Sequence, residues 1–303
     1  MTAVPPFPRR RLLASALALC ATAALSACSP ARLVNGLVPS DTYRFEGGIA
    51  YGAAPRQQLD VYRPLADAAG PTDGRKPPLV VFLYGGTWTH GDRAGFRFVG
   101  EALAARGAVV VIPDYGLSPA FRYPAFVRDS ALAVKWALDH AVRLGADPRR
   151  VHVMGHSSGA YNAAMVALDG RWLAEAGARP DQLAGWIGMA GPYDFLPIDD
   201  PEARVAFDWP ATPPDSQPYA HAGAGAPRTL LMAARDDRSV DPVRNTARLA
   251  TKLRAAGVEV RTESFDDLGH VTLIGAIARP LAWIGGPVLP PILDFIGLAQ
   301  AGR

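Results

Sequence analysis

A serine flanked by glycines carries the clearest chemical signal in the chain. Residues 155–159 read Gly-His-Ser-Ser-Gly and fit the pattern G-x-S-x-G, with Ser157 at the centre. Residues 150–154 before it read as a short buried strand, and residues 160–168 after it favour a helix. This order places the serine on a tight strand-to-helix turn, where the two flanking glycines relieve the crowding. The pattern predicts that Ser157 is a nucleophile.

A serine hydroxyl attacks efficiently only when a base takes its proton, and a histidine base needs a carboxylate to fix its tautomer. His270 follows the last predicted strand in a turn-like context, so we expect it to be the base. Asp236 and Asp237 follow the strand before that one. The order Ser, Asp, His, with each candidate after a successive strand, is that of the α/β-hydrolase fold.

The elements that must position these residues alternate along the chain. We expect strands at residues 58–63, 79–83, 108–112, 151–154, 183–189, 229–233 and 258–264, and helices at residues 95–106, 125–144, 158–168 and 242–256. Continuous apolar strands separated by amphipathic helices are typical of a mostly parallel sheet with helices on both faces. The sequence therefore predicts one α/β domain.

From about residue 58 to residue 277 the chain resembles the α/β-hydrolase superfamily. Within it, the chain looks like the carboxylesterases related to hormone-sensitive lipase, the feruloyl esterases and kynurenine formamidase. Four segments carry the resemblance. They are residues 84–88 with 91–93, similar to H-G-G-x-W…G-D-[KR]; residues 113–119 with 123–125, similar to P-D-Y-R-L-[AS]-P…[FY]-P-A; residues 188–194; and residues 234–240, similar to G-x-x-D-x-x-V. The last segment places the acid at Asp237, with Asp236 as the alternative.

The resemblance also implies an oxyanion hole made of the backbone N–H groups of Gly85, Gly86 and Ser158. Two residues depart from the family pattern. Tyr84 stands where the family usually has the histidine of its oxyanion loop, and Gly116 stands where it usually has arginine. Neither departure removes the backbone donors, but Tyr84 leaves open how the loop is held.

Other residues near these motifs have two readings each. Trp88, Tyr115 and Tyr193 are expected to bind substrate from loops at the carboxyl edge of the sheet, and core packing is the alternative for each. His156 is adjacent to the nucleophile and cannot easily reach its hydroxyl in a useful geometry. Because no histidines are paired at metal-ligand spacing, we expect no metal site, and the chemistry requires no cofactor.

The N-terminus resembles a bacterial lipoprotein signal. Three arginines precede an apolar stretch at residues 12–25, and the residues before Cys28 resemble a lipobox. We expect residues 1–27 to be a signal peptide, lipidated Cys28 to attach the chain to a bilayer, and residues 28–48 to be a tether. The expected location is an exported lipoprotein, at the outer membrane or periplasmic face if the cell is Gram-negative. An ordinary signal peptide is the alternative, and the choice between Sec and twin-arginine export stays open.

Composition restricts the remaining possibilities. The 31 basic residues exceed the 28 acidic ones by the three arginines of the signal, so the mature chain is near neutral and nothing favours nucleic acid binding. Residues 49–303 are expected to form the hydrolase domain, within which residues 197–227 read as a cap or a surface excursion. The apolar residues 281–298 contain prolines, glycines and Asp294, which favour a packed helix over a membrane span.

These observations together predict a serine carboxylesterase. It would hydrolyse a small-molecule ester through a Ser-His-Asp triad and an acyl-enzyme. Two alternatives stay open: an aryl-formamidase or amidase of the same fold, and a catalytically silent hydrolase fold that serves as a binding protein. The sequence does not specify the natural ester, its acyl length or the oligomeric state.

Overall fold

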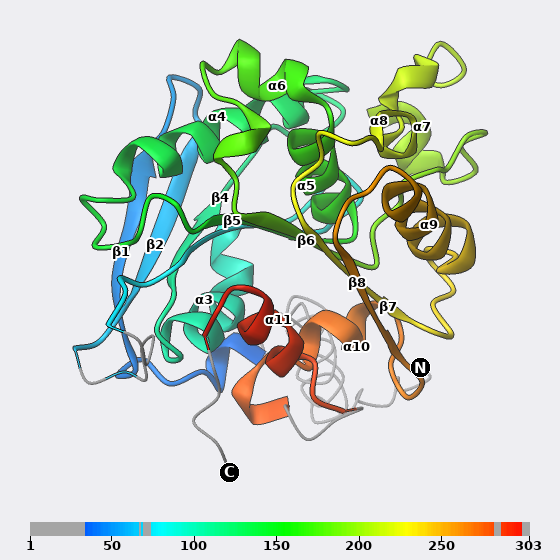
Figure 1. Ribbon diagram of the computed structural model, residues 1–303. Helices are drawn as coiled ribbons and strands as arrows, with labels where there is room; N and C mark the ends of the chain where they lie inside the picture. The colour runs from blue at the N-terminus through cyan, green and yellow to red at the C-terminus, as the bar shows by residue number, and fades with distance from the viewer. Residues whose placement is uncertain (1–33, 67, 69–73, 282–285, 299–303) are drawn as a thin grey trace, which may run out of the picture.

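A single mixed sheet organises the chain in the computed structural model, which describes residues 34–66, 68, 74–281 and 286–298. Its eight strands lie in the order β1-β2-β4-β3-β5-β6-β7-β8 (Figure 1). The strands are β1 (Tyr43–Ala50), β2 (Gln58–Pro64), β3 (Leu79–Leu83), β4 (Val109–Pro113), β5 (Val151–His156), β6 (Gly185–Met189), β7 (Thr229–Ala234) and β8 (Val260–Phe265).

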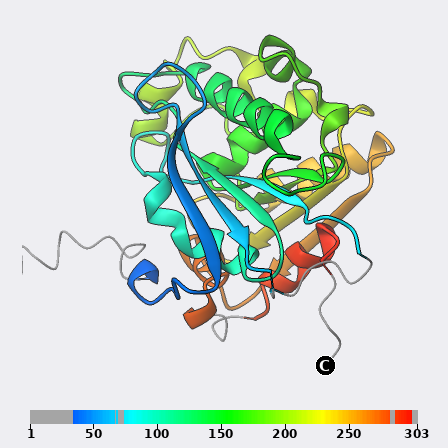
Figure 2. The ribbon, with the colours of Figure 1, turned by 90° about the vertical axis from the view of Figure 1, so that its left-hand side faces the viewer.

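The two N-terminal strands are antiparallel, and the rest of the sheet is parallel. β1 pairs with β2 and β2 with β4 in antiparallel fashion, whereas every pair from β4 to β8 is parallel. Figure 2 shows β1 and β2 at the near edge of the sheet. This mostly parallel sheet confirms the predicted α/β-hydrolase fold, and the carboxyl ends of β3, β5 and β7 meet at one edge.

Helices cover both faces of the sheet (Figure 1). On one face lie α4 (Ala125–His140), α5 (Ser158–Leu168), α6 (Gly170–Glu175), α7 (Pro201–Ala206), α8 (Pro218–His221) and α9 (Arg248–Ala255); on the other lie α3 (Arg97–Ala104), α10 (His270–Gly275) and α11 (Leu289–Phe295). Short turns of 3-10 type complete the structure at η1 (Arg93–Phe96), η2 (Pro180–Gln182), η3 (Pro214–Ser216) and η5 (Arg279–Leu281), and a π-helical turn forms η4 (Val243–Ala247).

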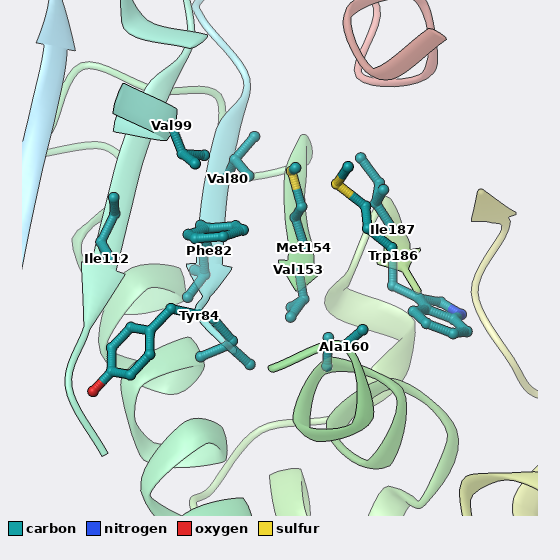
Figure 3. Close-up of a cluster of buried hydrophobic side chains, with 14 of the residues drawn as sticks. Val80, Phe82, Tyr84, Val99, Ile112, Val153, Met154, Ala160, Trp186 and Ile187 are labelled. Carbon is teal, nitrogen blue, oxygen red and sulfur yellow. The ribbon is translucent and has the colours of Figure 1, made fainter. Parts of the chain in front are cut away.

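The central strands are buried on both faces because each face packs against helices. Met154 of β5 and Ile187 of β6 point to one side of the sheet, and Val153 and Trp186 point to the other (Figure 3). All four side chains are inaccessible to solvent. Since both faces need apolar residues, these strands read as continuous apolar runs instead of alternating ones.

The predicted tether at residues 28–48 is wrong in its second half, because β1 begins at Tyr43. The side chain of Tyr43 is buried, and the ring of Phe45 lies 5.1 Å from that of Tyr62 on β2. The register of the β1–β2 pair shifts between Glu46 and Ile49, so the alternation typical of a strand is interrupted. This irregularity hid the strand from a pattern-based prediction. Cys28 and the signal lie outside the described residues.

The apolar C-terminal segment forms a packed helix where the structure describes it. α11 buries Leu289, Ile292 and Leu293, and the ring of its Phe295 lies 6.0 Å from that of His152 on β5. Among the described residues, no helix combines the length and the apolar character that crossing a membrane requires. The prediction of a packed terminal helix is thus confirmed for α11.

Candidate active site

Ser157 lies on a sharp turn between β5 and α5, with φ 55° and ψ −126°. Its N–H donates to the carbonyl oxygen of Met189 at 2.9 Å, which ties the turn to the end of β6. A Cβ atom on Gly155 would lie 2.1 Å from the carbonyl oxygen of Gly159. A Cβ on Gly159 would lie equally close to that of Leu83 at the end of β3. Only glycine fits at both positions, as the sequence pattern predicts.

The structure brings the three predicted triad residues together. His270 is the first residue of α10, and its Nε2 lies 2.8 Å from Ser157 Oγ. Its Nδ1 lies 2.7 Å from Oδ2 of Asp237, in the loop after β7. The imidazole therefore bridges the hydroxyl and the carboxylate at hydrogen-bond distance on both sides.

The carboxylate of Asp237 is almost fully buried, with 1% of its side chain exposed. Its Oδ1 accepts hydrogen bonds from the backbone N–H groups of Ser239 and Val240, at 2.8 and 2.9 Å. Burial raises the pKa of Asp237, but the hydrogen bond with His270 and the two backbone donors outweigh burial and hold that pKa below its usual range. The neighbouring Asp236 is exposed, and no hydrogen bond joins it to His270 in the described part of the chain. This geometry favours Asp237 as the partner.

The loop after β3 approaches the serine closely. A Cβ on Gly85 would lie 2.9 Å from Ser157 Cβ, and Gly86 has φ +143°. Within the described residues, the N–H groups of Gly85, Gly86 and Ser158 donate to no other protein group. Gly85 and Gly86 line one cavity at Ser157, and Ser158 lines another. Their uncommitted N–H groups are therefore the candidates for stabilising a developing oxyanion.

Tyr84 anchors this loop through its hydroxyl. The phenol donates to Oδ1 of Asp114 at 2.9 Å and accepts from Nη2 of Arg56 at 2.8 Å. Asp114 also accepts from the N–H of Arg93 at 2.8 Å and forms an ion pair with its guanidinium. Burial, together with the nearby charge of Asp114, holds the pKa of Tyr84 far above its usual value, so the phenol keeps its proton. The tyrosine thus replaces a loop histidine with a buried, fully paired hydroxyl.

Stacking fixes the same ring from both sides. The ring of Tyr84 stacks on Phe96 and on Tyr115, with centroid distances of 5.4 and 4.7 Å. The hydroxyl of Tyr115 donates to the carbonyl oxygen of Tyr84 at 2.7 Å. Gly116 is the second residue that departs from the family pattern. A Cβ on Gly116 would lie 2.7 Å from the ring of Phe121. Any larger residue there would require that ring to move.

Two cavities meet at the serine. One, of about 620 Å³, runs toward the start of the 197–227 segment, and its lining includes Ser157, His270 and Trp88. The other, of about 690 Å³, runs toward α3 and α10. Trp88 thus lines one cavity, although only 3% of the residue is exposed and its indole N–H already donates to Asn162 Oδ1 at 3.0 Å. Its role in substrate binding stays a prediction.

Tyr115 and Tyr193 do not line either cavity, so their predicted role in substrate binding disagrees with the structure. Both side chains are fully buried. Tyr115 is held by Tyr84, and Tyr193 packs edge-on against Trp186 at 6.0 Å. Their strand-end location was correctly read, but their side chains point into the core, so they belong to packing, the alternative reading.

Pattern reasoning set His156 aside as the base, and it missed three residues that line the first cavity. His156 is buried, and its Nε2 lies 3.0 Å from the carbonyl oxygen of His270. Burial, followed by the charge of His270, lowers the pKa of His156 to about 3, so it stays neutral. Ile198, Asp199 and Arg238 line the first cavity. Their only signal was position in loops at the carboxyl edge of the sheet. No three His, Cys, Asp or Glu side chains gather as a metal site among the described residues.

The hydroxyl of Tyr84 provides a test of the loop anchor. We expect Tyr84→Phe to lower the free energy of unfolding by about 1–3 kcal/mol, because a buried carboxylate and a guanidinium each lose a partner. Urea unfolding followed by circular dichroism measures the change. Tyr123→Phe is the matched control, since within the described residues the Tyr123 hydroxyl makes no hydrogen bond. Equal stability of the two variants would contradict the anchor.

The known proteins that are similar in sequence to this chain include esterases. Esterase LipC of Mycobacterium tuberculosis is 28% identical over 262 residues, which cover 80% of this chain and 62% of LipC. The isoprenylcysteine alpha-carbonyl methylesterase ICME of Arabidopsis thaliana is 31% identical over 156 residues, or 50% of this chain and 35% of ICME. The chain thus spans less than two thirds of either relative.

Solved structures show the same fold. Thermogutta terrifontis esterase 2 superposes with a TM-score of 0.67 at 22% identity, over 87% of this chain and 98% of that one. A thermostable esterase from Pseudomonas putida gives 0.62 at 24% identity, over 88% and 86%. The BD-FAE family model matches residues 59–253, which include the serine turn, the loop after β3 and Asp237. With more than half of its length matched by that model, the chain belongs to the BD-FAE family.

Proposed function

We propose that the protein is a serine hydrolase of carboxylic esters. The observation that carries the proposal is the hydrogen-bonded series Asp237–His270–Ser157, with distances of 2.7 and 2.8 Å, beside uncommitted backbone N–H groups. The esterases among the similar proteins support the same chemistry. A nucleophile, a base and oxyanion donors within reach of one point are what acyl transfer requires.

In the proposed mechanism, Ser157 Oγ attacks the ester carbonyl carbon while His270 Nε2 takes the hydroxyl proton. The N–H groups of Gly85, Gly86 and Ser158 stabilise the oxyanion of the tetrahedral intermediate. When this intermediate collapses, the bond to the alkoxy oxygen breaks, and His270 returns the proton to the leaving alcohol. An acyl-enzyme remains on the serine.

Water completes the proposed cycle. His270 takes a proton from the water as it attacks the acyl-enzyme, and a second tetrahedral intermediate releases the carboxylic acid and the free serine. Asp237 keeps the Nδ1 proton in place and stabilises the imidazolium that forms in each half-reaction. Because the pKa of Asp237 lies below its usual range, the carboxylate stays ionised at neutral and mildly acidic pH.

Removing the serine hydroxyl tests the nucleophile. We expect Ser157→Ala to lower kcat/KM for p-nitrophenyl butyrate by about 10⁴-fold or more, because no covalent intermediate can form. Hydrolysis by residues 29–303 measures the change, and labelling by a fluorophosphonate checks for the activated serine. Ser158→Ala is the control, since it keeps the backbone N–H. A folded protein that neither labels nor hydrolyses esters would redirect the search to formamides and then to a binding role.

Substitutions at the adjacent residues Asp236 and Asp237 test which carboxylate is the partner of His270. Asp237→Asn should lower kcat by about 10⁴-fold, because the amide cannot hold the imidazole in the required tautomer or stabilise its cation. Asp236→Asn should stay within about twofold of the unaltered enzyme, because that side chain is exposed and faces no partner in the site. Steady-state kinetics at pH 7 measures both. The reverse ranking would assign the role to Asp236.

We also propose that Cys28 anchors the protein to a bilayer as an exported bacterial lipoprotein. The supporting observation is the apolar stretch after three arginines, which ends at Leu25, followed by Ser26, Ala27 and this cysteine. In a bacterial host fed labelled palmitate, we expect the full chain to carry the label. Cys28→Ser should abolish it, whereas Cys20→Ser should retain it because Cys20 lies within the signal. A label that survives Cys28→Ser would contradict lipidation at this residue.

A further inference from the structure

The two cavities at Ser157 differ in chemical character. Only Thr87, Ser157 and His270 contribute to the lining of both. A carbonyl carbon attacked by the serine hydroxyl therefore sits at the junction of the cavities. One substituent of that carbon extends into each cavity, provided that the substrate fills both.

The larger cavity has an apolar wall. Val34, Phe96, Phe98, Val271 and Ile274 contribute to it, from the N-terminal segment, η1, α3 and α10. Burial of an alkyl or aryl group against these side chains is favourable by about 25 cal/mol per Å² of apolar surface. A hydroxyl group placed there would lose its hydrogen bonds to water without gaining charged partners.

Apart from Thr87, each polar side chain in the lining of this apolar cavity makes a hydrogen bond within the described residues. The side chain of Asp92 accepts from the N–H of Gly95 at 2.8 Å, and Nδ1 of the exposed His90 lies 3.0 Å from the Thr89 hydroxyl. His156 is neutral and is hydrogen-bonded to the backbone of His270. These contacts leave the apolar side chains to decide what the cavity accepts.

The smaller cavity has charged groups of both signs in its lining. Several of them are satisfied within the protein. Asp194 pairs with Arg248, Asp200 accepts from the N–H of Ala203 at 2.8 Å, and Arg244 donates to the carbonyl oxygen of Leu196. These groups already have partners within the protein, so they offer a substrate little further hydrogen bonding.

Arg238 and Asp199 differ from the other charged groups of this lining. Both side chains are exposed, and within the described residues neither makes a hydrogen bond or an ion pair. They supply an uncommitted donor and an uncommitted acceptor to the lining of the same cavity. A substituent that both accepts and donates hydrogen bonds, such as one bearing hydroxyl groups, satisfies both. A net charge of either sign would be repelled by one of the two.

We propose that the substrate is an ester with two unlike halves: an apolar group in the Phe98–Ile274 cavity, and an uncharged, hydroxyl-bearing group in the Arg238–Asp199 cavity. This inference rests on the proposed ester hydrolysis and adds its substrate class. Arg238 and Asp199 act as specificity-determining residues that contact the polar half. The division of polarity across the scissile bond follows from the two walls, whichever half is the acyl group.

Three esters of similar size test the division. Glycerol monobutyrate has a polar alcohol, butyl glycerate a polar acid, and butyl butyrate two apolar halves. We expect one of the first two to exceed butyl butyrate in kcat/KM by about tenfold or more, since hydrogen bonds to charged groups are worth that factor. The preferred ester also identifies which cavity holds the acyl group. Comparable kcat/KM values for all three would overturn the proposal while leaving ester hydrolysis intact.

Variants then assign the preference to the two residues. Arg238→Gln and Asp199→Asn should each lower the ratio of kcat/KM for the preferred polar ester to that for butyl butyrate, by about five- to tenfold. Arg235→Gln is the matched control, because Arg235 also follows β7 but pairs with Asp266 and does not line the cavity. If Arg238→Gln left this ratio of kcat/KM values unchanged, as Arg235→Gln is expected to do, the assignment would be overturned. Absence of any Ser157-dependent hydrolysis would instead refute the proposed function, and the inference with it.

Discussion

The close backbone contact at the serine turn is the constraint on which the site depends. Gly159 packs against the carbonyl oxygen of Leu83 at a distance that excludes any Cβ, so the start of α5 is pressed onto the end of β3. The chain continues from Leu83 into Tyr84 and the glycine pair that follows. One contact therefore sets both the position of the Ser157 hydroxyl and the approach of the backbone donors. A side chain at Gly159 would separate the two halves of the site before it affected the fold elsewhere.

Buried carboxylates hold two further parts of this arrangement, the imidazole of His270 and the loop after β3. Asp237 is compensated by His270 and two backbone N–H groups, and Asp114 by Tyr84 and Arg93. A buried charge is tolerated only when its partners are complete, and such complete networks favour one geometry over its alternatives. The first network orients the imidazole, and the second fixes the loop that carries the proposed oxyanion donors Gly85 and Gly86. Each network thus fixes the position of one part of the site.

The sequence predicted those features of the fold that depend on residues close together in the chain. The apolar strands and the serine turn were readable, because burial on both faces and the glycine requirement act within a few residues. The role of Tyr84 was not, since its partners Arg56 and Asp114 lie far from it along the chain and meet it only in the folded sheet. Tyr115 shows the remaining limit, because the sequence places a residue at the correct edge of the sheet but does not tell whether its side chain turns to the cavity or to the core.

The apolar and the polar cavity at Ser157 are lined by parts of the fold that contribute differently to packing. The apolar wall is built on α3 and α10, whose buried faces also pack against the sheet, so changes there affect stability as well as binding. The polar wall includes Asp199, at the start of the 197–227 segment, and Arg238, in the loop after β7, and both are exposed. Residues that bear little of the packing can change without disturbing the serine turn. In the proposed substrate, recognition of the polar half is therefore the easier to alter, while recognition of the apolar half depends on residues of the core.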